Sequence, residues 1–448
     1  MGMMRVFSFL PVNKEEAIPM NLQLIALILF IVMYTGMIIF TKHRPWIALG
    51  TAALFLILGI QPLSGVPGAI DWNVLMMLCG TMGTVALFIE SKMPNRMADG
   101  LLRLTPTVLG AAVVLSLFSG FVSAFIDNVA TVLMIAPVGL AIAKKLKISP
   151  IPLLISISVS SNLQGAATLV GDTTSIMLGG YANMDFLDFF FMNGRFSIFW
   201  AVELGAVATA PVIMFIFRKH RERIEPTPMT EVHDYFPSVL LVLNVALLIA
   251  ASFIPNKPAV TNGLICMALC LVGLTRTLIR DGNFSGVREA IKGIDYETLL
   301  LLAGLFVVIS GITNVGIIDE ISKLFVKIGG SNLFLMYTLI VFGSVLFSAF
   351  IDNIPYVATM LPVVQGIAGI MGCNPIVLYF GLLCGATLGG NLTPIGASAN
   401  IVTIGMLRKN GYEVKTSDFM RIGIPFTLVA VLAGYLFCWF VWSGAPVA

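Results

Sequence analysis

Two acidic residues, each followed by an asparagine, lie inside apolar segments of the sequence. Asp127-Asn128 and Asp352-Asn353 both end the string Ala-Phe-Ile-Asp-Asn. An ionised carboxylate in such a segment is costly unless it faces a wet cavity or a partner. Carboxylate and amide oxygens at a break in a helix can coordinate Na⁺, and the carboxylate can also carry a proton. A polar pair that only caps the helix break is the alternative interpretation.

Two further polar interruptions carry glycines and hydroxyl side chains, GAATLVGDTTSI (165–176) and GNLTPIGASANI (390–401). Glycine and proline unwind a helix here, and the freed backbone groups are tolerated at membrane depth only where they line a cavity. Packing glycines with a few hydroxyls are the alternative. The candidate binding residues are Thr168, Gly171, Asp172 and Thr173 in the first interruption and Thr393, Gly396, Ser398 and Asn400 in the second. We expect Asp127 and Asp352 to meet in one water-accessible pocket beside them.

The two halves of the chain repeat one another. The displacement that brings Asp127 onto Asp352 superimposes the two Ala-Phe-Ile-Asp-Asn strings and also the two glycine-containing interruptions. Nearly the same displacement brings IDWNVLMML (70–78) onto IDYETLLLL (294–302), and it is close to half the length of the chain. The sequence therefore contains two copies of one unit.

The composition places these units in a membrane. Of 448 residues, 58% are hydrophobic and only 11% are charged, against about 25% charged in soluble domains. This excludes the soluble enzymes, and a net charge of +3 gives no indication of nucleic-acid binding. Cysteines lie in apolar segments and histidines in polar connections, so we expect no metal cluster and no cofactor. Without a phosphate-loop motif, any ATP hydrolysis would need an associated ATPase subunit.

Windows of about 20 apolar residues predict an all-α polytopic protein with ten full spans. They lie near residues 21–40, 46–60, 72–90, 151–180, 196–217, 236–254, 258–279, 295–313, 375–407 and 420–442. The predicted organisation is an N-terminal tail (1–20), repeat 1 (21–217) with a hairpin (105–143) and a broken helix (151–180), a cytoplasmic linker (218–235), and repeat 2 (236–448) with a hairpin (332–371) and a broken helix (375–407). Paired full spans would fit both hairpin segments equally well.

Basic residues predict the orientation, because cytoplasmic loops are enriched in Lys and Arg. Twenty of the 26 fall in six segments that ten spans place on one side: 42–44, 92–103, 144–147, 218–223, 276–292 and 408–421. Both termini are then outside. Five full spans per unit is an odd number, so the two repeats are inverted relative to each other. Inverted repeats with broken helices are typical of secondary transporters, and a passive channel is the main competitor.

These motifs resemble the ion transporter superfamily with its citrate-transporter-like domain. The twin Ala-Phe-Ile-Asp-Asn strings, GDTTSIML (171–178) and GATLGGNLTPIGASANIV (385–402) look most like the branch of arsenite permeases, NhaD-type sodium/proton antiporters and the pink-eyed dilution protein. The resemblance implies an elevator-type carrier in the bacterial inner membrane, usually a homodimer. It also implies a scaffold of early helices and a mobile domain of hairpins and broken helices.

One departure from the family pattern narrows the range of solutes that we expect the protein to carry. In the dicarboxylate-carrying branch the hairpin tips read Ser-Asn-Thr, whereas here Asp replaces Ser, and Val129 or Ile354 replaces Thr. Like charges ~4 Å apart cost about 4 kcal/mol at an effective dielectric near 20, so two carboxylates disfavour a citrate-like anion. The sequence therefore predicts transport of a small inorganic solute coupled to Na⁺ or H⁺, by arsenite or antimonite efflux or by Na⁺/H⁺ antiport. The alternative is Na⁺-coupled uptake of an organic or inorganic anion.

Overall fold

The computed structural model describes residues 20–105, 107–220, 222–223 and 229–446. This part of the chain forms twenty α-helices, four short 3₁₀ helices and one two-stranded β-hairpin. The predicted N-terminal tail lies outside the described residues, except for Met20, at which α1 begins.

The elements of the first half are α1 (Met20–Ile39), η1 (Thr41–His43), α2 (Arg44–Ile57), η2 (Leu63–Gly65), α3 (Val66–Ala69), α4 (Trp72–Glu90), α5 (Met93–Leu102), α6 (Val108–Ser123), α7 (Asn128–Leu146), α8 (Ile151–Gly165), α9 (Thr173–Tyr181), η3 (Leu187–Phe189), β1 (Phe191–Met192), β2 (Arg195–Phe196) and α10 (Ile198–Ile216). Those of the second half are α11 (Phe236–Ser252), α12 (Thr261–Asp281), α13 (Ser285–Lys292), α14 (Tyr296–Asn314), α15 (Ile317–Gly329), α16 (Leu333–Ser348), α17 (Asn353–Met371), α18 (Ile376–Gly389), η4 (Gly390–Leu392), α19 (Ser398–Lys409) and α20 (Thr416–Trp442).

Eight helices of the described chain are long and apolar enough to cross a membrane: α1, α4, α7, α10, α12, α14, α17 and α20. Six of them coincide with predicted full spans. The other two, α7 and α17, fall in the segments predicted as hairpins. Two predicted full spans are shorter than a typical span, because α2 has 14 residues and α11 has 17.

Both predicted hairpin segments fold as two helices joined by a short turn, α6 with α7 and α16 with α17. Each turn ends at the acidic residue of its repeat unit, since Asp127 is the N-cap of α7 and Asp352 is the N-cap of α17. Both predicted broken helices are also interrupted, between α8 and α9 and between α18 and α19. The structure thus has a helix break at each of the four polar interruptions of the sequence.

Three short helices, α5, α13 and α15, were not predicted. Each has an apolar side and a charged side, so a search for uninterrupted apolar windows passes over it. α15 turns into α16 through a bend of 116°. A helix of this amphipathic kind is suited to lying along a membrane surface rather than crossing it.

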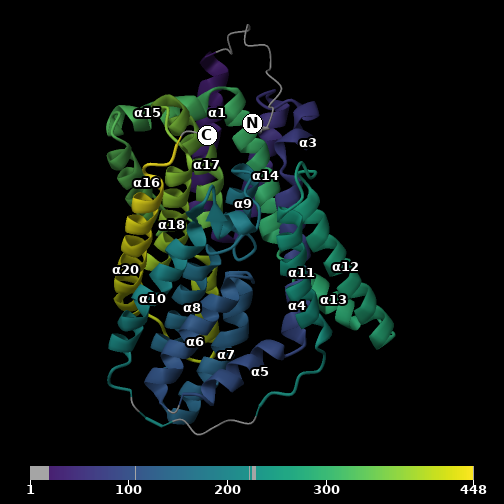
Figure 1. The fold of residues 1–448 in the computed structure, drawn as a ribbon. Coiled ribbons are helices and arrows are strands. Elements are labelled where there is room, and N and C mark those ends of the chain that lie inside the picture. The colour runs from purple at the N-terminus through teal and green to yellow at the C-terminus, as the bar shows by residue number, and fades with distance from the viewer. Residues whose placement is uncertain (1–19, 106, 221, 224–228, 447–448) are drawn as a thin grey trace.

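The helices pack in two groups that lie side by side (Figure 1). In one group α4 packs along α12, α2 packs along α14, and α1 and α11 join their neighbours α2 and α12. In the other group the hairpins and broken helices pack together, α6 with α8 and α16 with α18, and α10 packs along α20. The first group consists of the early helices of both halves.

Loops that the sequence places on one side of the membrane meet at one end of the molecule. Lys144 Nζ donates to Asn410 Oδ1 over 2.7 Å, and the backbone N–H of Thr230 donates to Asp99 Oδ2 over 2.8 Å. Figure 1 shows α5 at this lower end, while α15 and the last turn of α20 lie at the opposite end. The predicted grouping of the basic segments is consistent with this arrangement.

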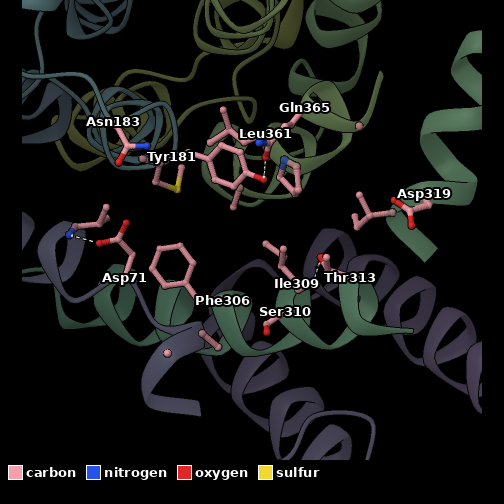
Figure 2. Close-up of a pocket in the computed structure, with 18 residues that line it drawn as sticks. Asp71, Tyr181, Asn183, Phe306, Ile309, Ser310, Thr313, Asp319, Leu361 and Gln365 are labelled. Carbon is pink, nitrogen blue, oxygen red and sulfur yellow. Dashed lines mark hydrogen bonds between the residues drawn. The ribbon is translucent and has the colours of Figure 1, made fainter. Parts of the chain in front are cut away.

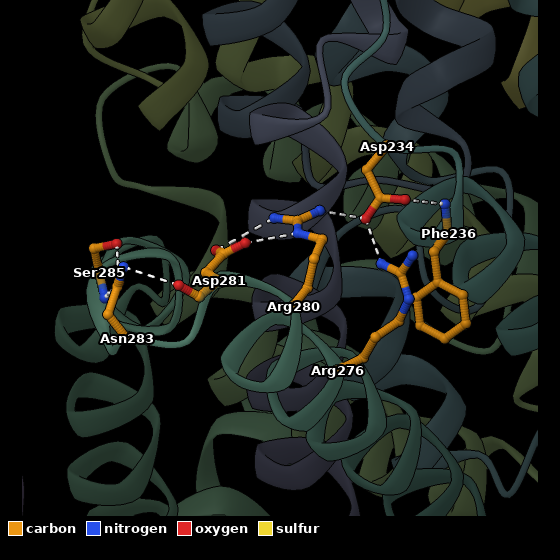
Figure 3. Close-up of polar contacts among 7 residues, drawn as sticks. All are labelled: Asp234, Phe236, Arg276, Arg280, Asp281, Asn283 and Ser285. Carbon is orange, nitrogen blue, oxygen red and sulfur yellow. Dashed lines mark hydrogen bonds and ion pairs between the residues drawn. The ribbon is translucent and has the colours of Figure 1, made fainter.

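A cluster of charged side chains joins Asp234, just before α11, to the end of α12 (Figure 3). Asp234 pairs with Arg276 and, over 2.6 Å, with Arg280, which also pairs with Asp281 at 2.7 Å. The guanidinium of Arg276 lies 4.2 Å from the ring centre of Phe236. The start of α11 is thereby held against the end of α12.

Candidate functional site

The two hairpin tips are built alike. Asp127 Oδ2 accepts hydrogen bonds from the backbone N–H groups of Val129 (3.0 Å) and Ala130 (3.2 Å), and Asp352 Oδ1 accepts one from Ile354 (3.2 Å). An acidic N-cap satisfies backbone donors that a helix start leaves without partners. Each carboxylate is therefore fixed at the start of a helix; Asp352 is buried, at 3% exposed, and Asp127 is half-buried.

Each hairpin tip contacts the interruption of the broken helix in its own half. Thr168 Oγ1 donates to the Ala124 carbonyl oxygen, and Thr393 Oγ1 donates to the Ala349 carbonyl oxygen. The two bonds are equivalent, because superimposing the halves brings Thr168 onto Thr393 and Ala124 onto Ala349. The threonines predicted as candidate site residues thus connect tip and break in both halves.

Gly171 and Gly396 let these backbones approach closely. A Cβ atom on Gly171 would lie 2.6 Å from the Gly165 carbonyl oxygen and 2.7 Å from that of Ala124. A Cβ on Gly396 would lie 2.6 Å from the carbonyl oxygen of Gly390. Cβ atoms essentially never come so near a backbone oxygen, so glycine is required at both positions by packing.

A buried network of polar side chains fills the space where the two broken helices cross. Asn162 stands at its centre: its Nδ2 donates to the Thr387 carbonyl oxygen (2.7 Å) and to Asn391 Oδ1 (3.1 Å), and its Oδ1 accepts from Asn128 Nδ2 (2.9 Å). Its other members, all buried, are Ser158, Ser161, Thr174 and Asn400. Its hydrogen bonds join residues of both halves, from Asn162 to Thr387 and Asn391 and from Ser158 to Asn400.

Asn162 and Thr387 occupy equivalent positions of the two halves, because 225 residues separate them. Two equivalent residues can touch only near the axis that relates the two copies. The polar network therefore lies at the centre of the pseudo-symmetric arrangement, where a transporter built from two repeats places its site.

Beside the first tip the structure has a cavity of about 160 Å³. Three carboxylates line it, those of Asp127, Asp172 and Asp295, together with Thr173 and apolar residues of α4. Asp172 is 4% exposed, and its Oδ2 accepts a 2.5 Å hydrogen bond from Thr174 Oγ1. Among the described residues that line this cavity there is no Lys or Arg.

The second tip has different surroundings. Arg44 Nη1 donates to Asp352 Oδ2 over 2.8 Å, and Ser398 Oγ donates to the same oxygen over 3.2 Å. Asp352 is not part of the lining of the cavity at Asp127. The two acids that we expected to meet in one pocket thus have separate environments, one facing a cavity and one paired with an arginine.

A larger cavity of about 360 Å³ (Figure 2) is lined by residues of α3, α9, α15 and α17, which lie in the upper half of Figure 1. Asp71 and Asp319 line it, and Tyr181 Oη donates across it to Gln365 Oε1 over 2.8 Å. Its lining includes the counterparts, in the other half of the chain, of residues at the smaller cavity: Asp71 for Asp295, Phe306 for Met82 and Ile309 for Val85. The two cavities are therefore equivalent regions of the two halves.

Not all predicted site residues line a cavity. Asp127, Asp172 and Thr173 line the smaller one, whereas Asn128 and Asn400 belong to the polar network. Asn162, Asn391 and Thr387 were missed, although an asparagine inside an apolar window is a signal that could have found Asn162. Arg44 was placed with the loop residues, because nothing in its local sequence indicates a partner 308 residues away.

Comparisons with known proteins agree with a transporter. A family model described as "Citrate transporter" matches residues 25–382. An uncharacterized transporter of Mycobacterium tuberculosis is 29% identical over 93% of this chain and 98% of its own length. The human P protein is 25% identical over 90% of this chain, which covers 58% of that protein.

Two solved structures share the fold. The YdaH transporter of Alcanivorax borkumensis has a TM-score of 0.60 at 12% identity and is covered over 98% of its length, with 94% of this chain matched. MtrF of Neisseria gonorrhoeae, described as illuminating a class of antimetabolite efflux pumps, has a TM-score of 0.55 at 16% identity, with 88% of this chain and 87% of that one matched. The resemblance to the ion transporter superfamily and the expectation of a transporter rather than an enzyme are confirmed.

Proposed function

The chain belongs to the citrate transporter family, and from that premise we propose that it is a secondary transporter that moves a small inorganic solute coupled to Na⁺ or H⁺. The observation that carries this proposal is the cavity at the first hairpin tip, lined by Asp127, Asp172 and Asp295 and by no described Lys or Arg. Three carboxylates that line a cavity of about 160 Å³ attract a cation and repel an anion. They can also accept hydrogen bonds from an uncharged solute that carries hydroxyl groups.

The Asp127 carboxylate is suited to a coupling ion. Both hydrogen bonds that it accepts reach Oδ2, which leaves Oδ1 available to a ligand in the cavity. Together with Asp172 and the hydroxyl of Thr173, this oxygen offers the hard donor atoms that Na⁺ takes, and a carboxylate can carry a proton instead. Arsenite or antimonite efflux and Na⁺/H⁺ antiport are both compatible with such a site.

We propose that transport occurs when the two inverted repeats exchange their conformations, so that the site opens first to one side of the membrane and then to the other. The support for this proposal is the set of contacts that recur in both halves, together with Figure 1, in which α5, α6 and α7 lie at the end opposite α15 and α16. α6 has 16 residues and is about 24 Å long, shorter than a hydrocarbon core of about 30 Å. Re-entrant hairpins explain this length better than paired full spans.

The two packing groups correspond to the parts of an elevator. The early helices of both halves form the scaffold, and the hairpins with the broken helices form the moving domain that carries the polar network. In this proposal the protein lies in the bacterial inner membrane with both termini outside. A homodimer and an associated ATPase subunit are further parts of it, and the mass of the purified complex tests both.

Flux measurements in proteoliposomes test the function. An imposed Na⁺ or pH gradient is expected to drive counterflow of Na⁺, H⁺, arsenite or antimonite in the wild-type protein. Asp127→Asn and Asp352→Asn are each expected to abolish coupled flux, because each removes a carboxylate that the cycle needs. Glu320→Gln is the matched control, since Glu320 is exposed and pairs only with Lys323 of its own helix.

Coupled flux that persists in Asp127→Asn would contradict the assignment. Conductance without counterflow would indicate a passive channel.

A second candidate is Na⁺-coupled uptake of an anion. The description of the family model and the presence of Arg44 at the second hairpin tip favour it. Uptake assays with citrate, a dicarboxylate and sulfate distinguish the two candidates. Only the anion transporter is expected to take up one of these solutes in response to an inward Na⁺ gradient.

A further inference from the structure

The second hairpin tip is neutralised by a cation that belongs to the protein. The Arg44 and Asp352 side chains are 12% and 5% exposed, and 2.8 Å separates Nη1 from Oδ2. Arg44 Nε also donates to the Met37 carbonyl oxygen over 3.2 Å, which orients the guanidinium. A buried carboxylate that loses its cationic partner is strongly destabilising, and Arg44 is the one Lys or Arg that pairs with Asp352 among the described residues.

Arg44 reaches the tip from the other packing group. It is the first residue of α2, and α2 packs along α14 in the group of early helices. A second contact comes from the same pair of helices, because Tyr34 Oη of α1 donates to the Pro355 carbonyl oxygen over 2.6 Å and lies 2.5 Å from Thr359 Oγ1. α1 and α2 therefore hold the first two turns of α17 with one ion pair and one hydroxyl.

Among the described residues, the first hairpin tip has no comparable ion pair with the group of early helices. The displacement that brings Asp71 onto Asp295 brings Arg44 onto Ala268 of α12, so the second half has no basic residue at this position. Among the described residues no Lys or Arg pairs with Asp127, which faces the acidic cavity. The two equivalent carboxylates thus differ in their surroundings: Asp127 faces a cavity, and Asp352 is paired with Arg44.

Asp352 has neighbours that could bind a cation if the guanidinium left. Ser398 Oγ already contacts its Oδ2 at 3.2 Å. Asn353 is 4% exposed, and its Nδ2 has no hydrogen-bond partner among the described residues. This buried amide is free to turn and to offer its oxygen as a ligand.

We propose that Arg44 is an internal competitor of the transported or coupling cation at Asp352, and this inference rests on the proposed cation-coupled function. When a monovalent cation binds Asp352, Ser398 and Asn353, the guanidinium is displaced and α1 and α2 release α17. When the cation leaves, Arg44 returns. One positive charge replaces another at Asp352. The charge of its carboxylate is therefore balanced both with and without the bound cation, and this buried group is never left unpaired.

Thermal unfolding of the purified protein tests the competition. NaCl is titrated at constant ionic strength with choline chloride, and the Na⁺ concentration for half-maximal stabilisation is measured. A competitor that occupies the site lowers the apparent affinity by the fraction of time that it is bound. Arg44→Gln is therefore expected to unfold at a lower temperature without Na⁺ and to reach half-maximal stabilisation at an about tenfold lower Na⁺ concentration.

Three variants make the result specific. Arg44→Gln combined with Asp352→Asn is expected to regain stability in choline and to lose the added Na⁺ response, because no charge is left unpaired. Arg44→Lys keeps the positive charge and is expected to lie between wild type and Arg44→Gln, which covers the case in which Arg44→Gln fails to fold. Arg276→Gln is the matched control, since it breaks an ion pair in which neither hairpin tip takes part.

Two results would overturn the proposal: a Na⁺ dependence of Arg44→Gln equal to that of wild type, or an equal gain in the Arg276→Gln control. The readout is cation binding rather than flux. Failure of wild-type flux with the Arg44→Gln effect intact therefore counts against the transport function, whereas normal flux without this effect counts against the role of Arg44.

Discussion

At the scale of single residues, Asn162 is a buried polar side chain with three hydrogen-bond partners. It is fully buried, and its amide bonds to Asn128, Thr387 and Asn391. Because these partners belong to a hairpin of one half and a broken helix of the other, one side chain couples elements that are far apart in the sequence. Buried networks of this kind specify a unique packing when every member is satisfied.

Replacing Asn162 by alanine is expected to destabilise the protein severely. The change leaves the Thr387 carbonyl oxygen and the Asn128 amide without partners, and each unsatisfied buried group costs about 1–3 kcal/mol. The melting temperature in detergent measures the effect. Asn283→Ala is the control, because Asn283 is exposed and bonds only within its own turn; an equal loss in both variants would contradict a special role for the network.

The identical strings around Asp127 and Asp352 show what local sequence can and cannot predict. It placed both acids at a break between two helices, with a helix cap as the alternative to an ion site, and the structure has both as N-caps. It could not predict that one faces a cavity and the other an arginine. That difference depends on Arg44, which is 308 residues from Asp352 in the chain.

At the scale of elements, the interruptions of the broken helices depend on close contact between backbones. Gly171 and Gly396 approach the carbonyl oxygens of the hairpin tips as well as those of their own helices. Their positions were predictable from the repeat, because the two glycines align when one half is superimposed on the other. The short amphipathic helices α5 and α15 were not predictable from apolar windows, since half of each surface is polar.

Gly171→Ala and Gly396→Ala are expected to impair folding and transport together. A methyl group at either position meets backbone oxygens within 2.8 Å, and overpacking of this kind costs about 1–3 kcal/mol. The yield of monodisperse protein and the rate of coupled flux measure the two effects. Gly405→Ala in α19 is the matched control, because its Cβ would meet nothing within 4 Å, and it is expected to retain both.

At the scale of the whole molecule, the segment that leads into the second half is held against α12 by the cluster around Asp234. Partial burial alone would raise the pKa of Asp234, but hydrogen bonds from Arg276 and the Phe236 amide, with the positive charges of Arg276 and Arg280, outweigh it and lower that pKa. A carboxylate with a lowered pKa in the folded state stabilises that state above the pKa of the unfolded chain.

Asp234→Asn is therefore expected to lower the melting temperature by a few degrees at neutral pH. The difference from wild type should shrink as the pH falls below about 4, the ordinary pKa of an aspartate, and vanish once Asp234 is protonated in the folded protein as well. Melting curves across this pH range provide the measurement. A difference that grows on acidification would contradict the sign of the pKa change.

The contact between Asn162 and Thr387 has a consequence for the origin of the chain. Suppose that the two halves descend from a gene of half this length whose product assembled in pairs. A position on the dyad of such a pair would have met its own copy, so the same side chain had to stand on both sides, although the accepting side contributes only its backbone carbonyl oxygen. Fusion of the genes removes this constraint, and an asparagine on one side with a threonine on the other is the kind of divergence that it permits.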